Sequence, residues 1–419
     1  MLLGAIADDF TGATDLAGML VAEGMRTVQT VGVPRRESPA PSADAVVVAL
    51  KSRTIAPDDA VAQSLAALDW LIAHGARQIY FKYCSTFDST PRGNIGPVAD
   101  TLADALDAPL AIVCPALPAN GRTIYNGHLF VGDVLLSDSP MRHHPLTPMT
   151  DASLVRLMQA QTARKVGLVA WPTIRQGPDA IRAAFAALER AQFRYAVTDV
   201  IDDADLAAIA TACADHRLIT AGSGIAKGLP ANFRRSGLLE PAQNAAVAIP
   251  SSGAAAVLAG SCSQATRAQV EHWKASFPAV AIDPRAAPDA DSLAASALAQ
   301  TERWLTSGTP FLIYSSAEPA VVAEIQRALS ADVAAARLEA AFGTIARRLV
   351  ERGVQRLVVA GGETAGAVVS ALGVEALAIG ASIDPGVPWT VSTGTRPIAL
   401  ALKSGNFGGV DFFEKALAR

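Results

Sequence analysis

The stretch LLGAIADDFTGATDLA, residues 2–17, decides the fold. A short apolar run is followed at once by two adjacent acids, Asp8 and Asp9, and then by a segment with Leu16, Met19 and Leu20 on one helical face. A strand that passes through a polar turn into a helix is the building unit of an α/β sheet. Two like charges beside a partly buried strand end are costly, so this turn needs a reason to carry them.

The same alternation of short apolar runs and Ala-rich helical stretches continues along the chain and predicts an α/β protein with largely parallel sheets. In the first half we expect strands at Leu2–Ala7, Thr27–Val33, Ala45–Ala49, Gln78–Lys82, Leu110–Val113, Val166–Ala170, Tyr195–Val200 and Leu218–Ala221, and helices at Asp58–His74 and Asp151–Gln161. In the second half we expect strands at Ala256–Ala259, Val280–Ile282, Phe311–Ser315, Arg356–Ala360 and Ile398–Leu402, and helices at Gln264–Ser276, Ser292–Thr306 and Asp332–Arg352.

The alternation lapses around residues 237–252, where Pro241, Pro250 and a Ser/Gly run predict a linker. We therefore expect two domains, residues 1–236 and 253–419. Each should be built on a largely parallel sheet flanked by helices.

Composition excludes several classes of protein. The 419 residues are 51% hydrophobic and 18% charged, with a formal net charge of −4. These values are typical of a globular chain without a broad basic surface, so we expect no nucleic-acid partner. The four cysteines have neither CxxC nor zinc-like spacing, no HExxH occurs, and no apolar run reaches the ~18 residues of a membrane span. The expectation is a cytoplasmic protein with reduced thiols, no metal site built on histidine and no membrane contact.

Polar side chains follow several of the predicted strands. Asp8 and Asp9 would lie at the carboxyl edge of the sheet, where open α/β sheets bind ligands. Arg53 in ALKSRT and Lys82 in FKYCSTFDST follow two other strands, and such cations suit a carboxylate ligand. The alternative for the two acids is that one caps the following helix and the other is solvated.

We expect a third polar segment, PALPANGRTIYNGHLF, to be a loop at the same edge. It carries Asn120, Arg122, Asn126 and His128. We expect His128 to be a structural hydrogen-bonder rather than a base.

The second half carries glycine-rich turns at strand ends. In RLVVAGGETAGAVVSALG, Gly361 and Gly362 precede a helix expected to begin near Thr364, and LKSGNFGG and Ser261 follow two further strands. Such turns let backbone amides approach a phosphate, so together they predict a nucleotide site assembled from several loops. A P-loop of the GxxxxGK[ST] type is absent. The segment AGSGIAKGL has the spacing GxGxxxG, with no acidic residue at a strand end about 20 positions later, which makes a dinucleotide site a weaker alternative.

With these motifs the sequence resembles the four-carbon acid sugar kinase family, and within it the 3-oxo-tetronate 4-kinases. The resemblance is carried by IADDFTGATDLA, ALKSRTI, FKYCSTFDSTPRGNIGPV, NGRTIYNGHLFVGD, HPLTPMTD, VAGGETAG and LALKSGNFGG. It implies an N-terminal acid-sugar-binding domain, a C-terminal nucleotide-binding domain and an active site in the cleft between them. It also implies ATP-dependent phosphorylation of the terminal C4 hydroxyl of a 3-oxo-tetronate, with Mg²⁺ expected and its ligands unknown.

Carried over by motif, the substrate-binding residues are Asp8, Asp9, Arg53, Lys82, Tyr83, Cys84 and Ser85, and the nucleotide-binding residues are Ser261, Gly361, Gly362, Glu363, Thr364 and Gly405. We hypothesise that Asp9 is catalytic and accepts the proton of the reacting hydroxyl, while Asp8 holds a neighbouring hydroxyl or a water of the metal shell. Arg53 and Lys82 would bind the substrate carboxylate. A D-threonate or D-erythronate kinase, an NAD(P)-dependent oxidoreductase and a non-catalytic sugar-acid sensor are the alternatives, and the sequence leaves a homo-oligomer open.

Overall fold

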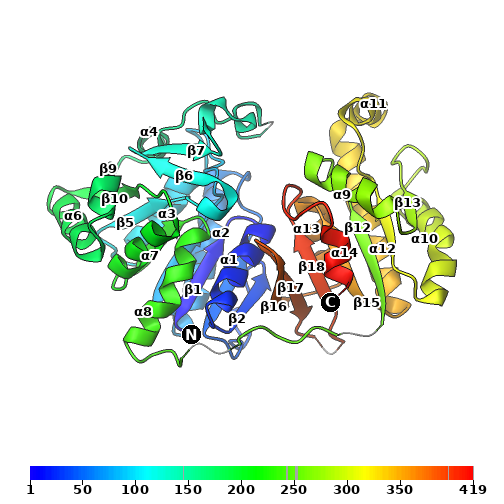
Figure 1. Ribbon diagram of the computed structural model, residues 1–419, viewed down its shortest axis with the longest axis horizontal. Helices are drawn as coiled ribbons and strands as arrows, with labels where there is room; N and C mark the ends of the chain where they lie inside the picture. The colour runs from blue at the N-terminus through cyan, green and yellow to red at the C-terminus, as the bar shows by residue number, and fades with distance from the viewer. Residues whose placement is uncertain (145, 242–243, 251–252, 395, 419) are drawn as a thin grey trace. The chain divides into compact units, whose positions relative to one another are not determined.

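The computed structural model of the chain describes residues 1–144, 146–241, 244–250, 253–394 and 396–418. The chain divides into two compact units, Met1–Ala245 and Ala246–Arg419. The division falls inside the 237–252 stretch where the sequence loses its alternation. Each unit is built on a mostly parallel sheet with helices packed against it (Figure 1).

In the first unit the strands run in the order β2-β3-β1-β4-β11-β5-β10-β9, with every pair of neighbours parallel. The strands are β1 (Leu3–Ala7), β2 (Thr27–Val31), β3 (Ala45–Ala49), β4 (Gln78–Lys82), β5 (Ala111–Cys114), β9 (Lys165–Val169), β10 (Phe193–Thr198) and β11 (Leu218–Ala221). The helices are α1 (Phe10–Ala22), α2 (Pro57–Ala73), α3 (Ile95–Ala105), α4 (Leu154–Gln159), α5 (Trp171–Ile174), α6 (Pro178–Arg190), α7 (Asp203–Ala212) and α8 (Leu229–Arg235). The predicted strands are found with their bounds shifted by at most two residues.

Strand β1 lies at the centre of this arrangement, between β3 and β4. All of its residues are buried, as is typical of parallel strands covered by helices on both faces. A Cβ at Gly4 would lie 3.1 Å from Leu71 Cβ of α2, so glycine here lets the helix pack close to the strand.

Helix α2 buries a different stripe from the one its large apolar residues suggest. The buried residues are Ala60, Ser64, Ala67, Leu68, Trp70 and Leu71, while Ile72 is 43% exposed. Small residues on the buried stripe allow the close approach to β1. The other predicted helix of this unit, Asp151–Gln161, begins only at Leu154 because the Ser153 hydroxyl caps it by accepting from the Arg156 amide.

The segment expected to be a polar loop forms a small antiparallel sheet instead. Its strands are β6 (Arg122–Tyr125), β7 (His128–Val131) and β8 (Val134–Leu135). Asn126 and Gly127 make the turn between β6 and β7, both with positive φ. An Asn-Gly pair between two strand-forming runs is a strong hairpin signal, so the loop prediction was wrong for a reason readable in the sequence.

In the second unit the order is β13-β14-β12-β15-β18-β17-β16. Pairings are parallel from β13 to β18, and β17 pairs antiparallel with both β18 and β16. The strands are β12 (Ala254–Ala259), β13 (Ala279–Ala281), β14 (Phe311–Tyr314), β15 (Val354–Ala360), β16 (Ala376–Asp384), β17 (Val387–Ser392) and β18 (Ala399–Lys403). The helices are α9 (Gln264–Lys274), α10 (Ala290–Ser307), α11 (Pro319–Leu329), α12 (Ala331–Glu351), α13 (Gly362–Ala371) and α14 (Phe412–Leu417).

The hairpin β16–β17 is one of the elements of this unit that the sequence analysis missed, together with α11 and α14. It turns at Gly386, which has φ of 78°. The core beneath it includes Trp273 of α9, Trp389 of β17 and Phe412 of α14.

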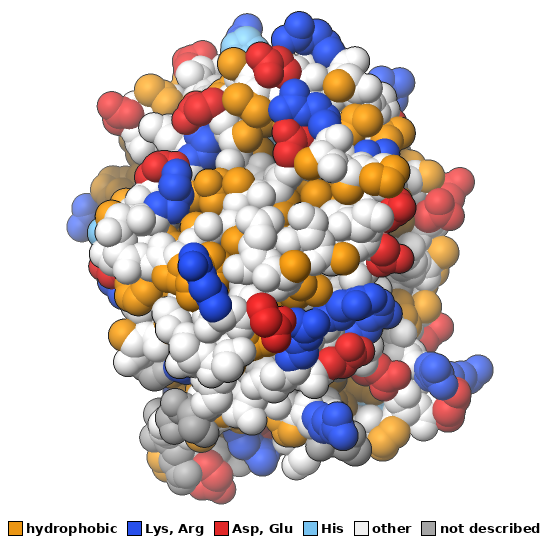
Figure 2. All heavy atoms as spheres, turned by 90° about the vertical axis from the view of Figure 1, so that its right-hand side faces the viewer, with side chains coloured by type: hydrophobic (Ala, Val, Ile, Leu, Met, Phe, Trp, Pro, Cys, Tyr) orange, Lys and Arg blue, Asp and Glu red, His pale blue; other side chains and the backbone are white. Residues whose placement is uncertain are grey.

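The composition bears on two features of the structure, the charge on the surface and the polarity of the helices. On the face shown in Figure 2, acidic and basic side chains are mixed with apolar ones, without a continuous field of either sign. Within the described ranges, every helix is too short or too polar to cross a membrane.

Candidate functional site

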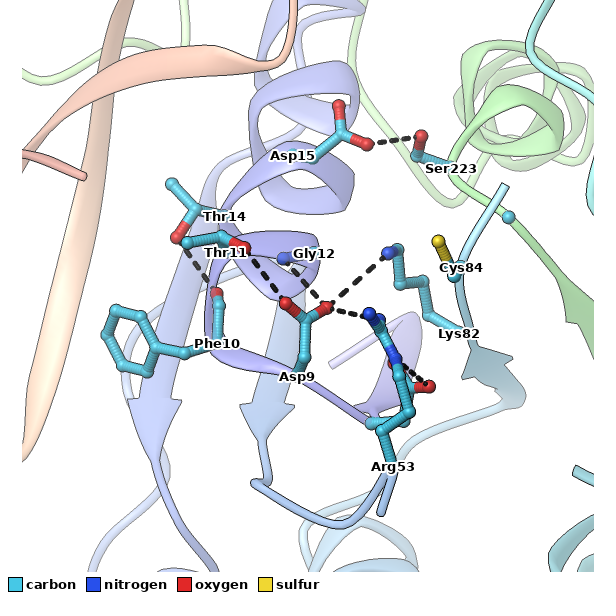
Figure 3. Close-up of polar contacts among 12 residues, drawn as sticks. Asp9, Phe10, Thr11, Gly12, Thr14, Asp15, Arg53, Lys82, Cys84 and Ser223 are labelled. Carbon is cyan, nitrogen blue, oxygen red and sulfur yellow. Dashed lines mark hydrogen bonds and ion pairs between the residues drawn. The ribbon is translucent and has the colours of Figure 1, made fainter. Parts of the chain in front are cut away.

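The first candidate site lies where β1, β3 and β4 end. The Asp8 carbonyl accepts hydrogen bonds from the amides of Ser52 and Arg53 at 3.0 and 3.2 Å, and the Asp8 amide donates to the Lys82 carbonyl at 3.0 Å. These bonds tie the three strand ends together. The structure thus brings Asp8, Asp9, Arg53 and Lys82 to one sheet edge, where Figure 3 shows the side chains of Asp9, Arg53 and Lys82 pointing toward one another.

Asp9 is the N-cap of α1. Its Oδ1 accepts from the Gly12 amide at 3.0 Å and from Arg53 Nη2 at 2.8 Å, and its Oδ2 accepts from the Thr11 hydroxyl at 2.8 Å (Figure 3). A carboxylate offers about four acceptor positions, so Oδ2 keeps one for a ligand. The Asp9 side chain is 27% exposed. It is therefore both ionic and accessible.

Burial alone would raise the pKa of the Asp9 carboxyl. The charges of Arg53 and Lys82, with hydrogen bonds from Thr11 and Gly12, outweigh burial and hold this pKa below its usual range. Asp9 is consequently a carboxylate at neutral pH.

Asp8 has a different environment from its neighbour. Arg53 donates from Nε to Asp8 Oδ2 at 2.9 Å and from Nη2 to Asp8 Oδ1 at 2.8 Å, a two-pronged contact. The Asp8 side chain is only 7% exposed. Asp8 is thus placed to hold Arg53, and its role toward a hydroxyl or a metal-bound water stays a prediction.

Arg53 is surrounded by carboxylates. Besides Asp8 and Asp9, the Asp88 Oδ2 lies 3.7 Å from Arg53 Nη1. Arg53 Nε is occupied by Asp8, and Nη2 by Asp8 and Asp9. Nη1 is therefore the nitrogen left to reach a ligand. The FKYCSTFDST segment predicts Asp88 among the polar residues at this sheet edge, although not among the substrate-binding residues.

Lys82 is the less occupied of the two cations. Its Nζ lies 3.9 Å from Asp9 Oδ1 and makes no hydrogen bond to any residue that the structure describes. Its side chain is 5% exposed. A Cβ at position 12 would overlap both Lys82 Nζ and Asp9 Oδ1, so these side chains would have to shift if Gly12 were replaced.

The residues after Lys82 differ in what they can contact. Tyr83 is fully buried and its hydroxyl donates to the Thr220 carbonyl at 3.0 Å, so its side chain belongs to the core. Its place among the substrate-binding residues stays a prediction. Cys84 and Ser85 are half-buried in the turn that follows. Burial raises the pKa of the Cys84 thiol to about 12, which keeps it neutral at pH 7.

Asn94 is a positioning residue that the sequence analysis missed. Its side-chain amide donates to the carbonyls of Ser52 at 2.7 Å, Arg53 at 3.3 Å and Ile55 at 3.0 Å. It therefore fixes the loop that carries Arg53. An Asn directly before a helix is expected to be its cap, but Asn94 makes no side-chain capping bond to α3.

Asp15, in the second turn of α1, is buried. Its Oδ2 accepts from the Ser223 hydroxyl at 2.5 Å (Figure 3). Burial, only partly offset by Lys82 and by that bond, raises the pKa of Asp15. The surroundings of α1 thus lower the pKa of Asp9, its N-cap, and raise the pKa of Asp15.

His128 and the glycines of AGSGIAKGL have structural roles in the first unit. His128 Nδ1 lies 2.8 Å from the Asn126 carbonyl, as expected of a structural hydrogen-bonder. In AGSGIAKGL, a Cβ at Gly222 would lie 2.6 Å from the Pro115 carbonyl oxygen and one at Gly224 would lie 2.5 Å from that of Ala116. These glycines serve close packing, which removes the reason to expect a dinucleotide there.

The second candidate site lies where β12, β15 and β18 end. The Gly361 amide donates to the Lys403 carbonyl at 2.9 Å, and the Ser261 amide donates to the Ala360 carbonyl at 3.2 Å. A Cβ at Gly361 would lie 3.2 Å from the Ser261 amide nitrogen, and one at Gly405 would overlap Ser261 Oγ. The turns that carry Ser261, Gly361 and Gly405 are therefore in contact.

The remaining predicted residues of this site begin α13. Gly362 is its first residue, followed by Glu363, which is exposed, and Thr364, which is buried. Thr364 Oγ1 lies against Gly260 and Gly361, because a Cβ on either glycine would meet it. Backbone amides at a glycine turn before a helix suit a phosphate.

Metal ligands are not grouped in either site. Among the residues that the structure describes, no cluster of three or more His, Cys, Asp or Glu side chains could hold a metal ion. Mg²⁺ in phosphoryl-transfer enzymes is commonly held by one or two carboxylates, by water and by the substrate phosphates.

Comparison with known proteins gives the two units separate descriptions. Residues 3–229 match the family described as a sugar-binding N-terminal domain, and residues 256–413 match the family described as a nucleotide-binding C-terminal domain. Both matches lie within single units of the fold.

Curated relatives match along nearly the whole chain. A Burkholderia multivorans protein named 3-oxo-tetronate kinase is 58% identical, over 99% of this chain and 96% of its own. A Pseudomonas fluorescens protein of the same name is 56% identical, over 100% of this chain and 97% of its own. One from Salmonella typhimurium, with the same name again, is 45% identical over 99% and 98%.

Solved structures agree in fold. A crystal structure from Salmonella typhimurium LT2, described as that of a tRNA synthase, has a TM-score of 0.90 at 44% identity, covering 99% of this chain and 98% of that one. A Haemophilus influenzae structure described under the family DUF1537 has a TM-score of 0.80 at 43% identity, covering 99% of both chains. By its motifs, its two domain matches and these relatives, the chain belongs to the four-carbon acid sugar kinase family, among the 3-oxo-tetronate kinases.

Proposed function

We propose that this chain is an ATP-dependent kinase that phosphorylates the C4 hydroxyl of a 3-oxo-tetronate to the 4-phosphate, in the catabolism of four-carbon acid sugars. The names of the relatives and the two domain descriptions support the reaction. The observation that carries the proposal is the edge formed by Asp9 and Lys82, an ionised carboxylate with one open acceptor position beside a cation with unused donors.

Asp9 is assigned to the reacting hydroxyl. Its free Oδ2 position accepts the hydrogen bond of the C4 hydroxyl, whose oxygen bonds to the γ-phosphorus while the bond from that phosphorus to the β,γ-bridging oxygen breaks. ADP leaves, and the hydroxyl proton passes to Asp9. A carboxylate of lowered pKa is a weak base, which suits phosphoryl transfer because its transition state depends mainly on alignment and charge neutralisation.

Lys82 is assigned to the substrate carboxylate, with Arg53 as its helper. Lys82 Nζ has donors to spare, whereas Arg53 has only Nη1. Asp8 keeps Arg53 in place. A neutral sugar of the same length should therefore be a poor substrate.

The nucleotide is assigned to Ser261, Gly361, Gly362, Glu363, Thr364 and Gly405. Gly361 is the N-cap of α13 and its amide donates to the Lys403 carbonyl, whereas Gly362 is the first residue of the helix. Ser261 and Gly405 come from the adjoining turns. Mg²⁺, when bound with ATP, would neutralise phosphate charge during transfer.

A substrate panel tests this proposal. The purified full chain is incubated with ATP and Mg²⁺ and with 3-oxo-tetronate, D-threonate, D-erythronate or a neutral four-carbon sugar, and ADP release is followed. We expect ADP with 3-oxo-tetronate above all and none without an acid.

Other outcomes would replace the proposal with a named alternative. Faster turnover of D-threonate or D-erythronate would change the substrate. A change in NAD(P)H absorbance without ADP would indicate an oxidoreductase. A rise in Tm with the acid but no turnover would indicate a sensor.

A further inference from the structure

Lys403, the last residue of β18, is a buried lysine that the reaction described above does not use. Its side chain is 0% exposed and, among the described residues, forms no ion pair with a carboxylate. Its ammonium instead donates to the Thr266 hydroxyl at 3.0 Å, the Ser404 carbonyl at 3.0 Å and the Gly405 carbonyl at 3.1 Å. Three donors meet three neutral oxygens, so the cation is satisfied without a counter-charge.

The Gly405 carbonyl is held from a second direction as well. The hydroxyls of Ser263 and Thr266, at the start of α9, donate to it at 2.6 and 2.8 Å. Thr266 is fully buried. The two successive carbonyls of Ser404 and Gly405 are therefore turned inward onto a fixed cluster of donors.

The orientation of these carbonyls fixes the neighbouring amides. Every peptide bond here is trans, and in a trans peptide the C=O and the N–H point in opposite directions. The N–H groups of Gly405 and Asn406 consequently point away from the Lys403 cluster. Within the described part of the chain neither of them donates a hydrogen bond, although the next amide, Phe407, bonds to the Ser404 carbonyl at 3.2 Å.

Two successive free amides that point the same way form a concave anion-binding site. The Gly405 and Asn406 amides belong to the turn that contacts Ser261. Asn406 is exposed. We propose that Lys403 is a positioning residue of the nucleotide site, whose buried ammonium gathers two carbonyls so that the amides of Gly405 and Asn406 bind a phosphate of ATP. This inference rests on the proposed function for the identity of the nucleotide.

The choice of lysine follows from the physics of the cluster. A neutral hydrogen-bond donor could hold the carbonyls, but an ammonium also places a positive charge behind the amides that face the phosphate. Burial of an unpaired charge is expensive and is usually retained at functional sites. Consistent with this cost, burial lowers the pKa of Lys403 to about 7.

Binding of ATP and of inorganic tripolyphosphate to the full chain tests the proposal by calorimetry. In Lys403→Met we expect both to bind about tenfold to a hundredfold more weakly, because charge-assisted bonds hold the loop. The KM for ATP should rise accordingly while the KM for the acid changes less than twofold. Adenosine, which has no phosphate, should bind the variant and the wild type alike.

Matched variants separate this role from a general structural one. Lys274→Met removes a lysine from the exposed side of the same helix that carries Thr266 and should leave ATP and tripolyphosphate binding unchanged. Thr266→Ser keeps the hydroxyl and should retain binding, whereas Thr266→Val should weaken it. If Lys403→Met does not fold, the Thr266 pair decides the question.

Three results would overturn the inference. The first is unchanged tripolyphosphate binding in folded Lys403→Met, or in Thr266→Val where Lys403→Met does not fold. The second is an equal rise in the KM for ATP and the KM for the acid. The third is that the wild type does not bind tripolyphosphate. The substrate panel is independent of these measurements. A chain that binds tripolyphosphate through Lys403 but releases no ADP would refute the kinase proposal alone, and an active kinase indifferent to Lys403→Met would refute this inference alone.

Discussion

Lys82 and Lys403 occupy equivalent positions in their two units, each as the last residue of a buried strand, yet their surroundings are opposite. Lys82 ends β4 and lies 3.9 Å from a carboxylate oxygen of Asp9. Lys403 ends β18 and, among the described residues, hydrogen-bonds only to two carbonyls and a hydroxyl. The first lysine is part of a cluster of formal charges, and the second is enclosed by dipoles.

The difference matches what each edge has to bind. A small sugar acid offers hydroxyls and one carboxylate, which ionised groups of both signs can orient individually. A polyphosphate offers many equivalent oxygens, which suit rows of backbone amides. In the roles proposed above, the lysine of the first unit contacts the ligand itself, and the lysine of the second shapes the backbone that does.

The sheet edge that carries Asp9, Arg53 and Lys82 is the charged edge of the first unit. Among its variants, we expect Asp9→Asn to lose the most activity. Asparagine retains a cap for α1 but cannot accept the proton, so we expect kcat to fall by roughly 10²–10⁴-fold, the range for loss of a general base. ADP release at saturating ATP and acid measures this. Near-normal kcat in a folded variant would show that Asp9 is not the proton acceptor.

A second capped helix provides the control. Asp202 caps α7 through the amides of Ala204 and Asp205, far along the chain from the charged edge. Asp202→Asn should leave kcat within about twofold of the wild type, because surface caps act on stability by only about 1 kcal/mol.

Lys82→Met should produce the next largest effect, with a specificity opposite to that of Lys403→Met. Loss of a charge-assisted contact is worth about 1.5–3 kcal/mol, so the KM for the acid should rise about tenfold to a hundredfold. The KM for ATP should stay within about twofold. Steady-state kinetics with each substrate varied in turn distinguishes the two lysines, and equal changes in both constants would contradict the comparison.

The sequence was sufficient to bring the right strand ends together. Carboxyl ends of parallel strands share an edge, so Asp9, Arg53 and Lys82 could be predicted as neighbours once each was placed after a strand. The Asn126-Gly127 hairpin was also readable, and it was missed because the segment was judged by its polar residues.

The sequence could not predict which residue each of these side chains contacts. Arg53 was expected to bind a ligand, but its fork is occupied by Asp8, a pairing between residues 45 positions apart. Tyr83 follows Lys82 directly, yet its side chain lies in the core because a strand and its extension direct successive side chains to opposite faces. The setting of Lys403 depends on Thr266, 137 positions away, and no local pattern encodes that contact.

Gly12→Ala tests how tightly the charged edge is packed. The added Cβ would overlap Lys82 Nζ and Asp9 Oδ1, so we expect a loss of stability of about 1–3 kcal/mol and a higher KM for the acid. Gly366→Ala in α13 is the matched control, because a Cβ there meets nothing within 4 Å. That variant should gain about 0.5–1 kcal/mol from helix propensity. Equal stability changes in the two variants, measured by urea unfolding, would show that position 12 has room to spare.

The pH dependence of stability gives the smallest effect and the most direct view of the buried lysine. Burial lowers the pKa of Lys403 from 10.5 to about 7, so between these values the unfolded chain holds one proton more than the folded chain. The free energy of unfolding should therefore rise with pH from about 7, by up to about 1.4 kcal/mol per pH unit from this group, and Lys403→Met should lack that rise. Burial raises the pKa of Cys114 to about 11, so this thiol acts in the opposite direction once the pH approaches 9. Urea unfolding of the wild type and Lys403→Met between pH 7 and 8.5, compared at each pH, isolates the lysine; parallel curves would mean that its ammonium is not held in a desolvated site.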